Sequence, residues 1–126
     1  MTFHLAGTPV TFLYVSERER ALGFYCDTLG ATLRSSDEFG DFVDLGRGLA
    51  RMTVMPDRAG GPHPALGWEV ADIEATVDAL VGRGIGFTVY DGMGQDPRGI
   101  WTSPDARSKL AFFTDPDGNV LMLVQA

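Results

Sequence analysis

Hydrophobic and polar positions follow the same order in both halves of the chain. In the first half, the apolar run Val10–Val15 is followed by a polar break and then by a helical pattern over residues 16–30. In the second half, residues 65–70 form the apolar run and residues 71–84 carry the helical pattern. Each helical pattern ends at glycine. This order predicts a repeated unit in which a short strand precedes a helix.

Both predicted helices have start and stop signals. Ser16 and Glu19 have the spacing of a capping box at the first helix, and Asp72 is the candidate cap of the second. Gly30 ends the first helix because glycine readily adopts positive φ, and Gly82 or Gly84 ends the second. The predicted buried faces consist of Leu22, Tyr25, Cys26 and Leu29 in the first helix, and Ile73, Val77, Leu80 and Val81 in the second.

Three strand candidates follow each helix, and a Gly/Pro-rich linker separates the halves. The candidates are residues 31–35, 41–45 and 49–55, then 86–90, 109–114 and 119–125. Asp115-Pro-Asp-Gly118 predicts a tight turn before the last strand. The long loop 92–108 is a candidate binding loop. The fold class is therefore α+β, with two βαβββ modules, 8–56 and 65–126, joined by the linker 57–64 in a single domain, 1–126. Their sheets are expected to curve around a shared ligand cleft.

Composition and charge narrow the functional classes. The chain has 126 residues, of which 44% are hydrophobic, so it is long enough for one domain and too apolar to be disordered. The single cysteine, Cys26, excludes an intramolecular disulfide framework and favours a reducing compartment. No apolar run is long enough to span a membrane, and no signal peptide is visible, so a cytoplasmic location is expected. The net charge of −7 disfavours nucleic acid and favours cationic ligands, although it also serves solubility.

Three tracts resemble the vicinal oxygen chelate superfamily, which includes glyoxalase I, the bleomycin-resistance proteins and the extradiol dioxygenases. They are Phe24-Tyr25-Cys26-Asp27-Thr28-Leu29-Gly30, the turn Asp115-Pro-Asp-Gly-Asn119, and the tract from Leu66 to Val77. The resemblance covers nearly the whole chain, from about Val10 to Gln125. The resemblance implies paired βαβββ modules and a homodimer. It does not specify a reaction, because one fold hosts many functions.

The resemblance also implies where a metal would bind. In the metal enzymes of this superfamily, the first and last strands of each module supply His, Gln or Glu ligands. Counting along the repeat places Val10, Met52, Ala65 and Met122 at these positions, with an uncertainty of one residue at Met52. None of these side chains suits a hard divalent metal. His4 and His63 are expected at the surface, so no metal cofactor is predicted unless the ligands are other residues.

Strand alternation assigns residues to the predicted cleft, because successive side chains point to opposite faces. Val10, Phe12 and Tyr14 share one face, and Leu13 and Val15 share the other. Glu69 is the polar exception on the predicted inner face of the second module, where a ligand or an arginine such as Arg51 would be its partner. The candidate ligand-binding residues are Phe12, Tyr14, Met52, Glu69, Tyr90, Trp101 and Met122. Alternatively, the apolar members simply fill the core.

The leading hypothesis is a metal-independent small-molecule-binding protein that resembles the bleomycin-resistance proteins and sequesters its ligand in an apolar cleft. The alternative is a lyase, an isomerase or a dioxygenase-like enzyme of the same superfamily. Glu69 and Tyr14 would then be the acid/base groups, or a divalent metal would be held by ligands at other positions. A metabolite-sensing module without turnover is a third possibility. Cys26 is interpreted as a core residue and not as a nucleophile.

Overall fold

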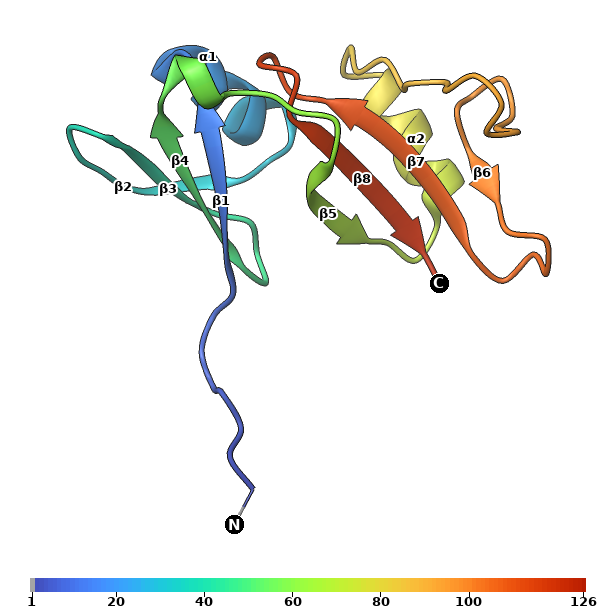
Figure 1. Ribbon diagram of the computed structural model, residues 1–126, viewed down its shortest axis with the longest axis horizontal. Helices are drawn as coiled ribbons and strands as arrows, with labels where there is room; N and C mark the ends of the chain where they lie inside the picture. Colours follow the sequence, from blue (N-terminus) through green and yellow to red (C-terminus); the bar gives the residue numbers. More distant parts are fainter. Residues whose placement is uncertain (1) are drawn as a thin grey trace. The chain divides into compact units, whose positions relative to one another are not determined.

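The computed structural model describes residues 2–126, which divide into two compact units after Arg58 (Figure 1). Each unit contains one four-stranded sheet and one main helix. The first unit consists of β1 (Val10–Val15), α1 (Arg18–Leu22), η1 (Gly23–Thr28), β2 (Thr32–Ser36), β3 (Gly40–Asp44), β4 (Leu49–Val54) and η2 (Pro56–Arg58). The second consists of β5 (Pro64–Glu69), α2 (Ile73–Val81), β6 (Trp101–Thr102), β7 (Lys109–Thr114) and β8 (Val120–Gln125).

The two sheets have the same topology. Their strand orders are β1-β4-β3-β2 and β5-β8-β7-β6. In each sheet the first strand pairs in parallel with the last, and the other neighbours are antiparallel. The predicted α+β fold with two βαβββ modules is therefore confirmed.

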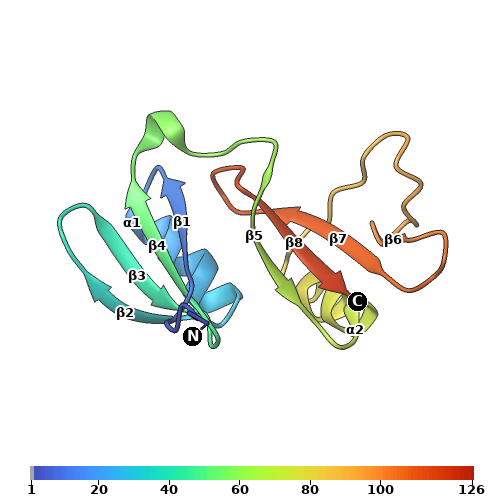
Figure 2. The same cartoon turned by 60° about the horizontal axis from the view of Figure 1, so that its bottom comes forward.

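One face of each sheet is buried against the helix of its own unit (Figure 2). In the first unit, this face is formed by Leu13, Val15, Val43, Ala50 and Met52, which are all almost completely buried. In the second unit, Ala111, Phe113, Leu121 and Leu123 are buried together with Ile73 and Val77 of α2. The opposite face of each sheet carries the residues of functional interest.

The first helix differs from its prediction at both the cap and the spacing. It begins at Arg18 with Glu17 as the N-cap, and no side chain caps it, so the predicted Ser16/Glu19 capping box does not form. From Gly23 the helix continues with π-helical spacing, and Leu29 N donates to Phe24 O over 3.0 Å. The wider turn changes which side chains are buried. Tyr25 is fully buried, whereas Leu22, Cys26 and Leu29 are half-buried.

The second helix follows its prediction more closely. The Asp72 carboxylate accepts a hydrogen bond from Ala75 N over 3.1 Å, as an N-cap does. The helix ends at Val81, with Gly82 as its C-cap. Val81 itself is exposed, so the predicted buried face is one residue too wide.

The turn between β7 and β8 is also as predicted. Asp115 O accepts from Gly118 N over 3.0 Å, and Gly118 has a φ of 82°. The Asp115 carboxylate accepts from the backbone N–H of Asp117 and of Asn119, both at 2.9 Å. Asn119 Oδ1 then accepts from Gly60 N over 3.0 Å, which ties the start of the second unit to this turn.

The strand predicted over residues 86–90 is wrong. This segment makes one backbone hydrogen bond to the sheet, from Thr88 N to Phe112 O over 2.8 Å, and β6 pairs with β7 at the sheet edge instead. The apolar residues Phe87 and Val89 suggested a strand. Thr88 O, however, bonds to the Gln95 side chain and not to a neighbouring strand. None of the helices in residues 2–126 is both long and apolar enough to cross a membrane.

Candidate ligand-binding faces of the two sheets

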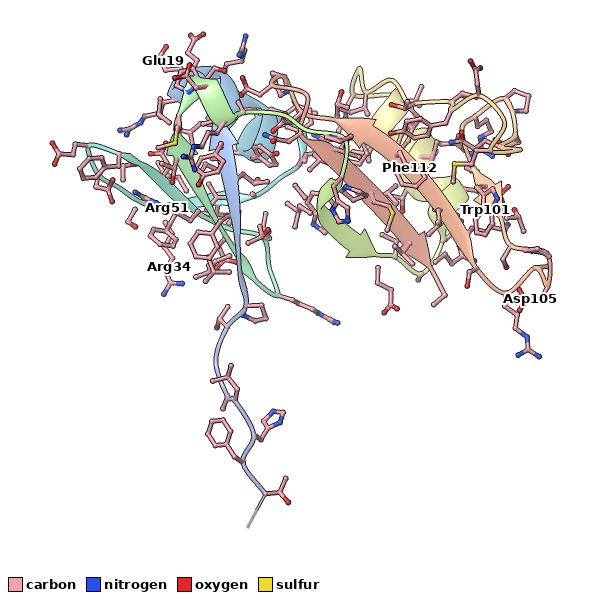
Figure 3. All side chains as sticks on the ribbon, in the orientation of Figure 1. Glu19, Arg34, Arg51, Trp101, Asp105 and Phe112 are labelled. Carbon is pink, nitrogen blue, oxygen red and sulfur yellow. The ribbon has the colours of Figure 1, made fainter. Side chains whose placement is uncertain are left out.

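The open face of the second sheet carries two rows of side chains, which we call the second-sheet face. Residues paired across neighbouring strands project to the same side of a sheet. The first row is Gly67, Met122 and Phe112, and the second is Glu69, Val124, Leu110 and Trp101. Figure 3 shows Phe112 and Trp101 on this unit. This face is therefore mainly apolar and aromatic, with a carboxylate at one end of the second row.

Tyr90 joins this face from outside the sheet. Its ring meets that of Phe112 edge-on, with 5.4 Å between the ring centroids. Four predicted ligand-binding residues, Glu69, Tyr90, Trp101 and Met122, are thus associated with a single face of the second unit. Glu69 is exposed, and it has no ion-pair partner among the described residues.

Phe112 is the residue that sequence reasoning missed. Both faces of β7 are apolar, because Ala111 and Phe113 project toward the helix-facing core while Leu110 and Phe112 project to the other side, where Phe112 is only 9% exposed. When a strand is apolar at every position, its sequence does not show which side chains face away from the helix. The pairing of Phe112 with Met122 would have been the only clue, and it requires the register of β7 against β8.

Gln95 holds the segment that carries Tyr90. Its Oε1 accepts from Tyr90 N over 2.6 Å, while its Nε2 donates to Thr88 O over 2.9 Å and to Gly99 O over 2.8 Å. One side chain therefore joins three points of the loop. The loop is also attached to α2, because Arg98 Nη2 lies 2.6 Å from the Asp78 carboxylate. These contacts fix the backbone of Tyr90 beside Phe112.

The first sheet has an equivalent open face, which we call the first-sheet face. It comprises Phe12, Tyr14, Phe42, Arg51 and Thr53, because Phe12 pairs with Arg51, Arg51 with Phe42, and Tyr14 with Thr53. Phe12 is 71% exposed and Tyr14 is partly exposed. The predicted alternation along β1 is therefore correct, since Leu13 and Val15 are buried on the opposite side.

The placement of Met52 on the open face is wrong. Met52 pairs with Leu13 and Asp41 on the helix-facing side, and its exposure is 0%. Arg51 pairs with Phe12 in the first unit as Met122 pairs with Gly67 in the second, so Arg51 is the equivalent of Met122. Counting along the repeat therefore placed the equivalent of Met122 one residue too late in β4. Because successive side chains of a strand point to opposite faces, this shift of one residue moved the position from the open face to the helix-facing side.

Arg51 is the most constrained charged side chain of the first-sheet face. Its Nη2 lies 2.8 Å from Asp37 Oδ1, and its Cζ lies 5.0 Å from the centroid of the Phe42 ring. The hydrogen bond from Arg51 and those from backbone N–H groups lower the pKa of Asp37 from 3.8 to about 2.

Two residue types with possible reactive chemistry lie outside these faces. Cys26 is half-buried on η1, and burial, followed by the charges of Asp27 and Asp41, raises the pKa of its thiol. This favours the unreactive thiol over the nucleophilic thiolate. His4 and His63 are both exposed.

The donor set does not fit the divalent metal that the superfamily's metal enzymes hold. With the register corrected, the four strand positions carry Val10, Arg51, Ala65 and Met122. Valine and alanine have no donor atom, a guanidinium stays protonated, and a thioether prefers soft metals. The structure groups no three His, Cys, Asp or Glu side chains that could hold a metal within residues 2–126.

The structure has two βαβββ units, and in each unit the first strand pairs with the last. This is the paired-module architecture that the resemblance implies. Residues 4–123 match the family model of the Glyoxalase/Bleomycin resistance protein/Dioxygenase superfamily, and the chain belongs to this superfamily. No curated protein matches the chain.

Solved structures show the same fold. A superfamily member from Sphaerobacter thermophilus DSM 20745 is 24% identical, with a TM-score of 0.74 over 97% of this chain and 98% of that one. TnmS3, an antibiotic binding protein from Streptomyces sp. CB03234, is 25% identical, with a TM-score of 0.67 and 98% coverage of both chains. The fosfomycin resistance protein FosX from Listeria monocytogenes is 10% identical, with a TM-score of 0.75 over 98% of this chain and 95% of that one.

Proposed function

We propose that the protein binds a planar, cationic small molecule on the second-sheet face and sequesters it without a metal ion. The observation that carries this proposal is the combination of Trp101 and Tyr90, which packs on the buried Phe112, with the exposed carboxylate of Glu69 on one side of the second unit. Aromatic faces attract cations, and a carboxylate on the same side of the sheet, at the opposite edge from Trp101, can add a charge-assisted contact to a ligand that spans the strands. The net charge of −7 favours the approach of a cation.

Two further observations support binding over metal-dependent catalysis. Val10, Arg51, Ala65 and Met122 supply no suitable ligand set, so the proposed function uses no metal. The antibiotic binding protein TnmS3 shares the fold at 25% identity. Met122 adds a flexible apolar side chain that can adapt to ligands of different shape.

A matched pair of probes tests this proposal. Proflavine is planar and cationic at neutral pH, whereas acridine has a similar ring system and is neutral. We expect proflavine to bind about tenfold more tightly than acridine, which corresponds to about 1.4 kcal/mol. Fluorescence reports the event, because Trp101 lies on the face while Trp68 stacks with Phe113 in the core, with 6.3 Å between ring centroids.

Glu69→Gln separates the local carboxylate from the overall charge. This variant is expected to lose the preference for proflavine, while Glu38→Gln removes the same charge from an exposed turn of the first unit and keeps it. A preference that persists in Glu69→Gln contradicts the proposal. So does a proflavine affinity that disappears when metal is removed with EDTA.

The alternative of acid/base catalysis uses Glu69 and Tyr14. These residues are equivalent in the two units. Tyr14 lies two residues after Phe12 and pairs with Thr53 of β4, and Glu69 lies two residues after Gly67 and pairs with Val124 of β8. The Glu69→Gln variant also distinguishes acid/base catalysis from sequestration. Loss of turnover of a substrate with retained binding favours the enzyme, whereas loss of binding favours sequestration.

A homodimer in the cytoplasm remains our prediction for the assembled protein. Sedimentation velocity tests the dimer, for which we expect a species of twice the 13.6 kDa chain mass. A single species at the chain mass contradicts it.

A further inference from the structure

Arg51 of β4, labelled in Figure 3, pairs with Phe12 of β1 on one side and with Phe42 of β3 on the other. Its side chain is only 12% exposed. Arginine is rarely buried to this extent unless its hydrogen-bonding groups are paired. The contacts of its guanidinium therefore indicate what the first-sheet face can bind.

Two contacts fix the guanidinium in place. Its Nη2 donates to Asp37 Oδ1 over 2.8 Å, and its Cζ lies 5.0 Å from the Phe42 ring centroid. Asp37 Oδ1 also accepts from Phe39 N over 2.8 Å and from Gly40 N over 3.1 Å, so the carboxylate is itself held by the turn. The result is a cation with a defined orientation, which loses little conformational freedom when it binds a partner.

The other terminal nitrogen of Arg51 is not satisfied. Nη1 is buried and has no hydrogen-bond partner among the described residues. A buried donor without an acceptor is unfavourable, and more so when it is charged. Asp37 uses Nη2, so Nη1 is left to bind one further acceptor. A carboxylate oxygen is the acceptor that suits a guanidinium best.

Phe12 supplies an apolar surface beside this donor. It pairs with Arg51 across the two strands, and its ring is 71% exposed. Large exposed aromatic side chains beside a polar anchor are typical of ligand sites. Phe42, which pairs with Arg51 from β3, and Tyr14, two residues along β1 from Phe12, are aromatic as well.

We propose that the first-sheet face binds an aromatic carboxylate. Nη1 of Arg51 donates to a carboxylate oxygen of the ligand, and the ligand ring packs on Phe12. Because Nη1 is buried in the free protein, its surroundings have to rearrange when the ligand binds. No covalent step is involved. This inference concerns the first unit alone and is independent of the cationic ligand proposed for the second-sheet face.

Isothermal titration calorimetry with 2-naphthoate and its neutral amide, 2-naphthamide, tests the proposal. Wild-type protein is expected to bind 2-naphthoate about tenfold more tightly than 2-naphthamide, although its net charge of −7 disfavours anions. Arg51→Met should abolish this preference. Arg47→Met removes the same charge from an exposed turn of the same unit and should retain it.

Several results overturn the proposal. Three of them concern the two probes directly: the absence of detectable 2-naphthoate binding, equal affinities for the two probes, and a preference that survives Arg51→Met. Glu69→Gln is expected not to weaken 2-naphthoate binding. A loss of binding in that variant would place the anion on the second-sheet face and would also overturn the inference.

A measurement on wild-type protein covers the case in which Arg51→Met does not fold. The side-chain ¹⁵Nε resonance of Arg51, assigned through Arg51→Lys, should shift when 2-naphthoate is added, while that of Arg47 should not. An Arg51 resonance that does not respond, with calorimetric binding present, places the ligand elsewhere and refutes the proposal.

Discussion

Replacing Gln95 with alanine tests how the second-sheet face is held together. The change removes three hydrogen bonds, to Tyr90 N, Thr88 O and Gly99 O, of which the last two are partly buried. At about 0.5–1.5 kcal/mol for each bond, with a discount for partial exposure, we expect the loop to lose about 2 kcal/mol of local stability. That corresponds to roughly a 30-fold rise in the local opening equilibrium.

Amide hydrogen exchange measures this opening directly. The Tyr90 amide donates to the Gln95 side chain, so its exchange should accelerate in Gln95→Ala. The Thr88 amide donates to Phe112 O in the sheet and should change much less. Affinity for proflavine should fall as well, because Tyr90 no longer stays beside Phe112.

Gln125→Ala is the matched control for this prediction. Gln125 Oε1 accepts from Ile73 N over 2.7 Å at the start of α2, so the same type of side chain is removed at a site outside the loop. This control should leave Tyr90 exchange unchanged. If Tyr90 exchanges at the wild-type rate in Gln95→Ala, Gln95 does not hold the loop and the reasoning is refuted.

Three other predictions concern the first unit. Gly40→Ala should lower the free energy of unfolding, measured with denaturant, by about 2–4 kcal/mol, because a Cβ at this position would lie 2.0 Å from a backbone oxygen of β4. The control Gly86→Ala, where the Cβ would enter open space, should be nearly neutral. The Asp37–Arg51 pair should stabilise the fold fully above the unfolded pKa of 3.8, and this stabilisation should be lost as the pH falls toward about 2. The difference in unfolding free energy between wild type and Asp37→Asn should therefore shrink over that range, and a difference that stays constant down to pH 2 contradicts this prediction. Cys26 should react with iodoacetamide more slowly than an unstructured cysteine peptide near pH 8, because its raised pKa leaves less thiolate, and an equal rate would argue against that environment.

The fold was predictable because its signals are local and repeated. The alternation along β1, the Asp72 cap and the turn from Asp115 to Gly118 each depend on a few neighbouring residues. Their repetition in two halves then predicted the βαβββ order. The capping box at Ser16 and Glu19 failed because the helix begins one residue later than the motif requires, and the change to π-helical spacing had no sequence signal.

The candidate faces were less predictable because they depend on pairing between distant strands. The choice between Met52 and Arg51 rests on a register that only the pairing of β1 with β4 defines. Phe112 was hidden in a strand with two apolar faces. The strand predicted over residues 86–90 failed for a related reason, since the Gln95 side chain takes the carbonyl of Thr88 that a neighbouring strand would bind.

The central claim is that Glu69 and the aromatic residues on the same face of the second sheet bind a cationic ligand without a metal ion. Titration of EDTA-treated, metal-analysed protein with proflavine tests this claim most directly, with Glu69→Gln and Glu38→Gln alongside. We predict binding at one site per chain in protein with far less than one metal ion per chain, and about a tenfold weaker affinity in Glu69→Gln alone. A stoichiometric iron, manganese, nickel or zinc ion whose removal abolishes binding, or an unchanged affinity in Glu69→Gln, would contradict the account.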